Sequence, residues 1–558
     1  MRLTRIQIEN YRSVKSLVFQ PGMLCALVGE NNAGKSNILR ALNLILGESW
    51  PSERMFSEED FYNHDTMQDI VIEVRGDTPC VLNRYGVQLE CCGLRIVVGH
   101  YKRAVKSKGK IAGDIKFDFW PLDKQGEPLK APDKPFAKGT KPSWSPLRVS
   151  NEIRDAFPFV YMDVRRDYAR HTPGSRWSVL NRLFSGVNDD FQRLDNTVTD
   201  DKGNRISRRE AFRQRVDAAF ELLRTQEFEK VQEAIRTHAL RQVGLDPTSS
   251  DVRIEFRPFD PLNAYKSLAL VLCEGGQEFE AEEIGAGYQS SIVVAIFRAY
   301  QELSRQGAII AIEEPEVFLH PHRQRFFYKV LSEIAKGGNQ VFYTTHSAQF
   351  VDIVAPENVC IVRRTYTDGT KVFTCPAQQW TPDQKERLKL EKEFDPERNE
   401  MFFAKGVLLC EGDTEKALYP VALQSKGIDL DEIGLSVVEV GGKKNLPIFV
   451  RVLEAFQIPY VAVFDEDNAN DNTNAIIKSA VSAATRLCIH KPNLEQVLGF
   501  AFKQRGKVES ALAFVKKGLS AAQDNILYAP VQRLLSEIRP DLLCRFTQSA
   551  TTTTANGG

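Results

Sequence analysis

The stretch CALVGENNAGKSNILRALNLIL, residues 25–46, has the pattern of an apolar strand, a glycine-rich loop and an amphipathic helix in immediate succession. Residues 29–36 fit GxxxxGK[ST], in which backbone N–H groups and a helix N-terminus hold phosphates. In this pattern the lysine reaches the terminal phosphates and the serine ligates magnesium. The loop therefore predicts an ATP and Mg²⁺ site formed by Gly29, Asn31, Asn32, Gly34, Lys35 and Ser36.

A second apolar strand far along the chain ends in two acids. Ala308 to Ile312 are followed directly by Glu313 and Glu314, as in a Walker B strand. Phosphoryl transfer needs charge neutralisation and an oriented nucleophile, so we expect Glu313 near the magnesium ion and Glu314 to polarise the attacking water. The next strand, QVFYTTHS, ends at His346. We interpret His346 as a γ-phosphate contact, the alternative being an ordinary histidine at a strand end.

The segment EEIGAGYQSSIVVAIFRAY, residues 282–300, has two glycines before a long apolar helix. It resembles the signature motif of ABC-type ATPases of the chromosome-maintenance and recombination branch, although its sequence departs from the common LSGGQ. The N-terminal strand IQIENYRS also resembles the N-terminal strand of that branch. The resemblance implies that two ATPase heads close on two ATP molecules, each completed by the other protomer. The residues assigned this role are Gly285, Gly287, Gln289 and Ser290. The alternative is a glycine-containing helix cap.

Composition limits the class of protein. A chain of 558 residues exceeds one ordinary core, so we expect two or three domains. The 73 basic and 73 acidic residues exclude a polycation, so nucleic-acid affinity must come from local patches. Ten cysteines without CxxC spacing indicate neither a disulfide framework nor a zinc knuckle. Residues 1–20 lack the uninterrupted apolar core of a signal peptide, and no run approaches membrane-spanning length. We therefore expect a cytoplasmic protein with no membrane contact.

The middle of the chain is less regular. Residues 71–120 alternate in short strand-like stretches, and the Pro- and Lys-rich residues 121–150 predict an exposed loop. Residues 175–250 have helical periodicity and many charges, which predicts a helical insertion serving as a dimerisation arm or a lid.

A second α/β pattern follows a charged linker. GVLLCEGDTE, SVVEVGGKKN and YVAVFDED contain three strands separated by helices, and the first and third strands end at Glu411 and Asp465. Alternating strands and helices predict a parallel sheet whose strand ends lie along one edge. Glu411, Asp465 and Asp467 should therefore converge. Crowded carboxylates repel one another unless a divalent cation neutralises them, and oxygen ligands favour Mg²⁺ or Mn²⁺.

These three blocks resemble a Toprim domain, and a Toprim domain directly after an ABC-type ATPase head resembles the overcoming-lysogenization-defect (OLD) nucleases. The resemblance implies a metal-dependent DNA nuclease, built as a homodimer or higher homo-oligomer and used in defence against phage. It further implies that a helicase-like or reverse-transcriptase (retron) partner accompanies some members. The implied metal ligands are Glu411, Glu415, Asp465, Asp467 and Glu495, and the implied phosphate-stabilising lysine is Lys507. Lys507 lacks the following proline of the family pattern, so Lys503, Lys516 and Lys517 remain alternatives.

The expected fold class is α/β: an ABC-type ATPase head over residues 1–395, a Toprim (Rossmann-like) domain over residues 396–545, and a disordered tail over residues 546–558. The expected function is that of an ATP-hydrolysing, divalent-metal-dependent DNA endonuclease whose ATP state controls the Toprim site. The alternative hypothesis is an ATP-driven DNA clamp or sensor that recruits another effector. Topoisomerase and primase are a third class, although no DNA-gate domain is apparent.

Overall fold

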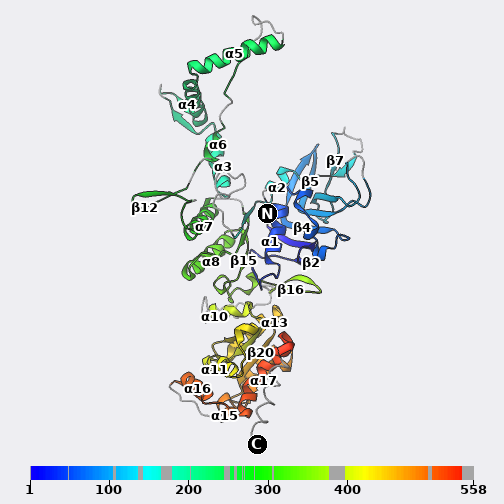
Figure 1. Cartoon of the computed structure of the whole chain (residues 1–558), viewed down its shortest axis with the longest axis vertical. Coiled ribbons are helices and arrows are strands. Elements are labelled where there is room, and N and C mark those ends of the chain that lie inside the picture. The colour runs from blue at the N-terminus through cyan, green and yellow to red at the C-terminus, as the bar shows by residue number, and fades with distance from the viewer. Residues whose placement is uncertain are drawn as a thin grey trace. The chain divides into compact units, whose positions relative to one another are not determined.

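The computed structural model describes residues 2–47, 49–104, 109–135, 143–164, 179–200, 203–243, 252–256, 260–266, 268, 270–281, 283–303, 307–375, 396–499 and 506–542. The chain divides into two compact units (Figure 1). The first combines Met1–Val164 with Gly307–Gly558, and the second is Arg165–Gln306. The predicted disordered tail and Lys503 lie outside the described residues.

The predicted nucleotide-binding strands form one six-stranded sheet in the first unit. Its order is β17-β16-β3-β15-β14-β9, and only the edge pair β16 and β17 is antiparallel. The strands are β3 (Leu24–Val28), β9 (Phe159–Met162), β14 (Ile309–Glu313), β15 (Gln340–Thr345), β16 (Val359–Thr365) and β17 (Gly369–Thr374). Because β3, β14 and β15 are parallel, the loops that follow them open at the same edge.

A five-stranded antiparallel sheet, in the order β2-β1-β4-β5-β6, packs on the same core. Its strands are β1 (Leu3–Tyr11), β2 (Val14–Phe19), β4 (Ile70–Arg84), β5 (Val87–His100) and β6 (Ile115–Leu122). The Pro- and Lys-rich stretch after β6 is not wholly an exposed loop. It contains the hairpin of β7 (Lys130–Pro132) and β8 (Trp144–Pro146), and Leu129 and Ala131 are buried. Both side chains belong to the buried apolar cluster of the first unit, and the free energy of burying them outweighs the turn-forming composition.

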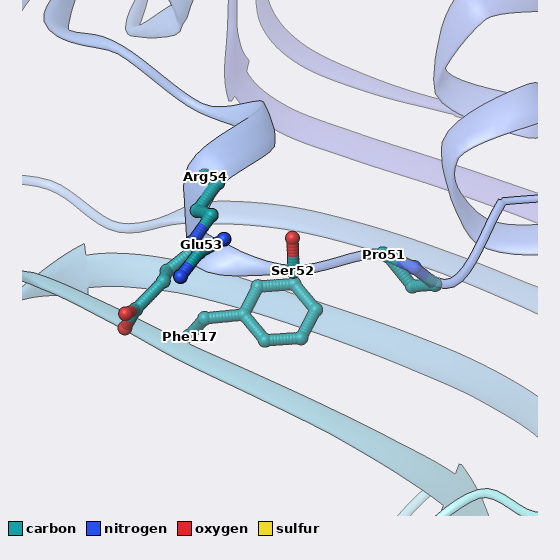
Figure 2. Close-up of a pocket in the computed structure, with 5 residues that line it drawn as sticks. All are labelled: Pro51, Ser52, Glu53, Arg54 and Phe117. Carbon is teal, nitrogen blue, oxygen red and sulfur yellow. The ribbon is translucent and has the colours of Figure 1, made fainter.

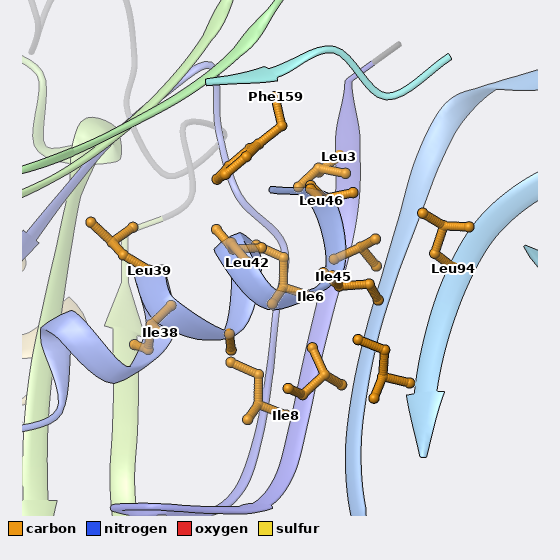
Figure 3. Packing of buried hydrophobic residues seen from close by; sticks show 14 of the residues in the cluster. Leu3, Ile6, Ile8, Ile38, Leu39, Leu42, Ile45, Leu46, Leu94 and Phe159 are labelled. Carbon is orange, nitrogen blue, oxygen red and sulfur yellow. The ribbon is translucent and has the colours of Figure 1, made fainter. Parts of the chain in front are cut away.

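Helix α1 (Lys35–Leu46) fixes the glycine-rich loop to this core. Its apolar residues recur at helical spacing, and Ile38, Leu42 and Ile45 belong to the same buried cluster as Ile6 and Ile8 of β1 (Figure 3). These three helix side chains are fully buried, and each contributes roughly 1.5–3 kcal/mol by leaving water. Their packing holds the N-terminus of α1 at the end of β3.

Three further helices complete the nucleotide-binding part and its connection to the C-terminal region: α2 (Asn151–Asp155), α8 (Pro321–Lys336) and α10 (Pro396–Asn399). Short 3-10 turns lie at Glu53–Met55, Glu58–Asp60, Tyr62–His64, Ala348–Phe350, Pro356–Asn358, Glu400–Phe402, Lys443–Asn445 and Ala484–Arg486. Among the described residues, no helix has the length and apolar character needed to cross a membrane.

The second unit is mainly helical. Its helices are α3 (Val179–Gln192), α4 (Arg208–Leu222), α5 (Gln226–Val243), α6 (Pro261–Lys266) and α7 (Ala286–Leu303), and its hairpins pair β10 (Thr197–Thr199) with β11 (Arg205–Ser207) and β12 (Val271–Glu274) with β13 (Gln277–Glu280). No described residue of α4 is buried. The dimerisation role of this region stays a prediction.

The C-terminal region contains the predicted parallel sheet, in the order β19-β18-β20-β21. The strands are β18 (Gly406–Cys410), β19 (Leu435–Glu439), β20 (Tyr460–Asp465) and β21 (Leu487–His490). The helices are α11 (Asp413–Gln424), α12 (Leu430–Ile433), α13 (Leu446–Ala455), α14 (Asn472–Ala480), α15 (Leu494–Leu498), α16 (Lys507–Lys516) and α17 (Ala521–Ile538). The predicted α/β class is confirmed, and the alternation of β18, β19 and β20 with helices places their carboxyl ends along one edge.

Candidate functional site

Two glycines let the phosphate-binding loop pack tightly against β16 and β17. Gly29 and Gly34 have φ angles of 159° and 105°. A Cβ atom on Gly29 would lie 2.1 Å from the Val362 carbonyl oxygen, and one on Gly34 would lie 2.3 Å from Thr370 Oγ1. The Thr370 hydroxyl instead donates to the Ala33 carbonyl at 2.9 Å. The loop therefore needs glycine at both positions, and Thr370 of β17 stabilises the loop through its bond to Ala33.

The Lys35 side chain folds back onto the phosphate-binding loop and contacts its backbone. Its Nζ donates to the carbonyl oxygens of Gly29 and Glu30, at 2.8 and 2.9 Å. Burial lowers the pKa of Lys35 to about 8, although the nearby Glu314, Glu316 and Glu30 carboxylates favour the charged form. Asn31 and Asn32 are exposed in the same loop, and Ser36 lies in the first turn of α1.

The first Walker B acid is buried beside a tyrosine from β9. Glu313 Oε1 accepts a hydrogen bond of 2.8 Å from the Tyr161 hydroxyl. Burial raises the pKa of Glu313, and the Tyr161 hydrogen bond and Arg40 partly oppose this rise. Tyr161 is not among the predicted site residues, and its signal in the sequence is a polar residue in the short apolar strand paired with β14.

The structure brings Glu314 and His346 together. His346 Nε2 lies 3.9 Å from Glu314 Oε1, and the Glu314 backbone has a φ of 44° held by N–H bonds to Thr344. Burial, with the charge of Lys35, lowers the pKa of His346. Glu316, also missed by the sequence analysis, accepts the His346 backbone N–H at 2.6 Å and the Thr345 hydroxyl at 3.0 Å. It therefore holds the turn that carries the histidine.

The signature residues lie in the second unit. Gly285 precedes α7, Gly287 and Gln289 lie in its first turn, and Ser290 follows in the same helix. Their predicted role in the site of another protomer stays a prediction.

The acids of the C-terminal region gather at the carboxyl edge of its sheet. Glu411 directly follows β18 and Asp465 ends β20, and the Asp465 N–H donates to Glu411 Oε2 at 3.4 Å. Glu411 also accepts the Gly442 N–H with its backbone oxygen, at 2.8 Å, so the glycine turn after β19 meets the same edge. Asp467 has a φ of 49° and a largely exposed carboxylate. Glu466 between them pairs instead with Lys478 and Lys491.

Burial and mutual repulsion raise the pKa values of two of these acids. Desolvation is the main cause at Glu411, where Asp465 adds to it. Desolvation, with the charges of Asp465 and Glu411, raises the pKa of Glu415 to about 7. In the described part of the chain, no three His, Cys, Asp or Glu side chains already form a ligand cluster. A divalent cation nevertheless fits this donor set, because it would favour ionised oxygens that repel one another without it.

Lys507 lies close to the predicted acids. Its Nζ is 2.9 Å from Glu495 Oε1, and this hydrogen bond is the main cause that raises the Lys507 pKa, with contributions from Glu415 and Asp465. Lys516 and Lys517 are exposed at the opposite end of α16. The geometry therefore favours Lys507 over Lys516 and Lys517.

Two basic residues at this edge were missed by the sequence analysis. Lys443 is buried, donates to the Glu466 carbonyl at 3.1 Å, and lies 3.6 Å from Asp467 Oδ2. His490 ends β21, and its Nδ1 lies 3.1 Å from Asp465 Oδ1. Burial opposes the imidazolium, but the hydrogen bond with Asp465 and the nearby Cys488 outweigh it and raise the pKa of His490 to about 9. The pattern that identified Asp465, a polar residue at the end of an apolar parallel strand, applies equally to His490 at the end of LCIH.

Two consecutive buried polar residues, Arg398 and Asn399, connect the turn that follows His346 with the end of β19, next to the glycine turn beside Glu411. Asn399 accepts the Ile353 N–H at 3.1 Å and donates to the carbonyls of Ala348 and Val351, at 3.1 and 2.8 Å. Its neighbour Arg398 bonds Glu439 at the end of β19. The turn at 348–353 follows His346, and Glu439 accepts the Gly441 N–H in the glycine turn beside Glu411.

An open pocket elsewhere contains none of the predicted site residues. It is lined by Pro51, Ser52, Glu53, Arg54 and Phe117, from the Glu53–Met55 turn and β6 (Figure 2). It therefore adds nothing to either site.

Comparisons with known proteins agree with the predicted ATPase region and with the predicted Toprim region. Residues 402–467 match the family described as "Overcoming lysogenization defect protein-like, TOPRIM domain", and residues 1–119 and 183–351 match an AAA ATPase domain. The chain is 32% identical over 526 residues to an OLD nuclease of Thermus scotoductus, covering 89% of this chain and 92% of that protein. It is 23% identical over 500 residues to the Old nuclease of Escherichia phage P2, with coverages of 82% and 76%. It is also 24% identical over 227 residues to endonuclease GajA of Bacillus cereus, with coverages of 36% and 33%. The chain thus belongs to the OLD (overcoming lysogenization defect) nuclease family, with an ATPase head followed by a Toprim domain.

Proposed function

We propose that this protein is an ATP-hydrolysing DNA endonuclease that needs Mg²⁺ or Mn²⁺ and whose nucleotide state controls cleavage at the Toprim site. The observation that carries the nuclease assignment is the convergence of Glu411, Glu415 and Asp465 at one sheet edge. The Asp465 N–H reaches the Glu411 carboxylate, and burial together with the charge of Asp465 raises the pKa of Glu415. Such an edge binds a divalent cation through hard oxygen donors.

Glu411, Glu415, Asp465, Asp467 and Glu495 are the residues that would hold metal. A bound divalent metal supplies an activated water and stabilises the leaving oxygen during phosphodiester hydrolysis. Lys507, which contacts Glu495 and lies near the charges of Glu415 and Asp465, would neutralise charge on the scissile phosphate. The glycine turn at 441–442 has positive φ angles and no side chains, so a DNA backbone can approach Glu411 closely.

The ATPase head contains the second set of site residues, those of the nucleotide site. In this proposal Lys35 and the loop N–H groups bind phosphates, Ser36 and Glu313 serve the magnesium ion, and Glu314 orients the attacking water. His346, 3.9 Å from Glu314, would contact the terminal phosphate. Gly285, Gly287, Gln289 and Ser290 would complete the site of a second protomer, so we propose a homodimer or higher homo-oligomer.

The link between the sites supports nucleotide control. Asn399 binds the turn after His346, and Arg398 binds Glu439 beside the glycine turn of the Toprim edge. Both residues are buried, and a buried polar contact is costly to break without replacement. A shift of the His346 turn on nucleotide binding would therefore move the strand-end residues that surround Glu411.

A cleavage assay tests the proposal. Purified protein, supercoiled plasmid and Mn²⁺ or Mg²⁺ should give nicked or linear DNA, and EDTA should stop the reaction. Asp465→Ala should remove cleavage while leaving ATP hydrolysis within about twofold. Glu466→Gln is the matched control and should cleave, since Glu466 pairs with Lys478 and Lys491 rather than with the site.

If the wild-type protein binds plasmid but never cuts it with either metal, the nuclease assignment is wrong and the chain is an ATP-driven DNA clamp. Defence against phage is the biological role that the family resemblance supports. A helicase-like or reverse-transcriptase partner would be expected to co-purify with the native protein and change the cleavage rate.

A further inference from the structure

We propose that His490 is a positioning residue that orients Asp465 toward the metal of the Toprim site. This inference rests on the proposed function, and it assigns a role to a residue outside the set of predicted acids. His490 is the last residue of β21, in register with Asp465 at the end of β20.

The contact between His490 and Asp465 is within hydrogen-bonding distance and is shielded from solvent. His490 Nδ1 lies 3.1 Å from Asp465 Oδ1, and the imidazole side chain is 3% exposed. The Leu494 N–H donates to the same Oδ1 at 2.9 Å. Two donors of the protein therefore engage one carboxylate oxygen, and no described residue donates to Asp465 Oδ2. That oxygen is left for a cation.

The segment around His490 also holds the rest of the acidic turn. The Glu466 N–H donates to the His490 carbonyl at 2.9 Å, and the Asp467 N–H donates to the Pro492 carbonyl at 2.7 Å. Residues 490–494 thus fix the backbone of Glu466 and Asp467. In the same segment, His490 and the Leu494 N–H act on the Asp465 side chain. Leu494 uses its backbone, so His490 is the one side chain in this segment whose replacement tests carboxylate orientation.

Orientation matters because a ligand that is already aligned loses less side-chain freedom when it binds metal. Residues that hydrogen-bond a metal ligand from behind typically contribute 10–100-fold in metal affinity or activity. The expected effect of removing the imidazole is therefore a weaker metal site in a folded chain.

Three substitutions separate orientation from folding. In His490→Asn, the amide Nδ2 takes the position of the imidazole Nδ1 and can donate to Asp465 Oδ1. His490→Leu removes the donor at similar bulk. His490→Gln keeps an amide but carries it one methylene further from the backbone, beyond this position.

The direct readout is Mn²⁺ binding to the full-length chain without nucleotide, followed by the electron paramagnetic resonance signal of free Mn²⁺. Binding by Asp465→Ala gives the background of other sites. His490→Leu and His490→Gln should raise the Mn²⁺ dissociation constant by about tenfold or more, and His490→Asn should restore it to within about threefold. Thermal unfolding should show all three variants folded, and ATP hydrolysis should be unchanged.

The second readout is the Mn²⁺ concentration that gives half-maximal plasmid cleavage, which should shift in parallel. Unchanged Mn²⁺ binding in His490→Leu, or a His490→Asn chain as impaired as His490→Leu, would overturn the positioning role. If only His490→Leu fails to fold, the comparison of His490→Asn with His490→Gln decides the same question. A wild-type chain that binds Mn²⁺ but cleaves no DNA contradicts the proposed function and leaves the binding test of His490 valid.

Discussion

The guanidinium of Arg398 donates to both carboxylate oxygens of Glu439, at 3.0 and 3.3 Å, while its side chain is only 10% exposed. The next residue, Asn399, makes three hydrogen bonds to the turn that follows His346. Two consecutive residues therefore connect the Toprim sheet to the turn beside the nucleotide site. Such a connection is expected if ATP binding is to influence a distant metal edge, because coupling requires contacts that differ between states.

Loss of this connection should uncouple the two activities. In Arg398→Ala and Asn399→Ala, plasmid cleavage should become equal with and without ATP, while ATP hydrolysis is retained. The measurement is the ratio of cleavage rates with and without nucleotide in wild type and variants. Arg451→Ala, at an exposed position of α13, is the matched arginine control and should keep the wild-type ratio. An unchanged ratio in both junction variants would contradict the coupling route.

Glu314→Gln should slow ATP hydrolysis by about 10²-fold or more, because an amide cannot accept the proton of the attacking water. The ATP-bound form should accumulate in a filter-binding assay. Glu333→Gln, on the exposed side of α8, should hydrolyse ATP at the normal rate. Equal turnover in Glu314→Gln and wild type would rule out the Walker B assignment.

Gly34→Ala should abolish ATP binding. The new Cβ would lie 2.3 Å from Thr370 Oγ1 and 2.6 Å from Ser13 Oγ, at a φ of 105° that favours glycine. Binding of a fluorescent ATP analogue measures the effect. Gly186→Ala in α3 is the control, since its Cβ would meet no atom within 4 Å. Tight analogue binding by Gly34→Ala would show that the loop tolerates a side chain and rearranges.

Lys507→Ala should lower plasmid cleavage by at least about tenfold, because the site loses a cation opposite the phosphate. Lys516→Ala lies on the same helix at its exposed far end and should cleave normally. Rates at saturating Mn²⁺ distinguish loss of catalysis from loss of metal. Should Lys516→Ala be the impaired variant, the assignment of Lys507 from its contact with Glu495 would be wrong.

Tyr161→Phe should lower stability by roughly 1–3 kcal/mol, the typical cost of leaving a buried hydrogen-bonding group without its partner. The group affected is Glu313 Oε1, which accepts the Tyr161 hydroxyl at 2.8 Å. Denaturant unfolding of the full chain measures the change. Tyr366→Phe, at a fully exposed position, should leave the midpoint unchanged. A midpoint shift of equal size in both variants would mean that the Glu313 contact contributes nothing specific.

Local patterns were sufficient to predict much of the fold. The apolar runs before Gly29, Glu313, Glu411 and Asp465 became buried strands, because an apolar run of this length between turn residues has few other stable states. The exposed loop predicted over residues 121–150 was wrong in part, since β7 and β8 pair within it. Composition predicted turns there, but the burial of Leu129 and Ala131 is a tertiary effect.

The sequence by itself determined which residues stand at strand ends, and therefore which acids could meet along a parallel edge. Only the tertiary structure decided which partner each of them has: Tyr161 for Glu313, His346 for Glu314, His490 for Asp465 and Glu495 for Lys507. The physical reason is range. Strand and helix formation depends on neighbours a few residues apart, whereas these pairs join segments 12 to 152 residues apart that meet only after the sheets have assembled.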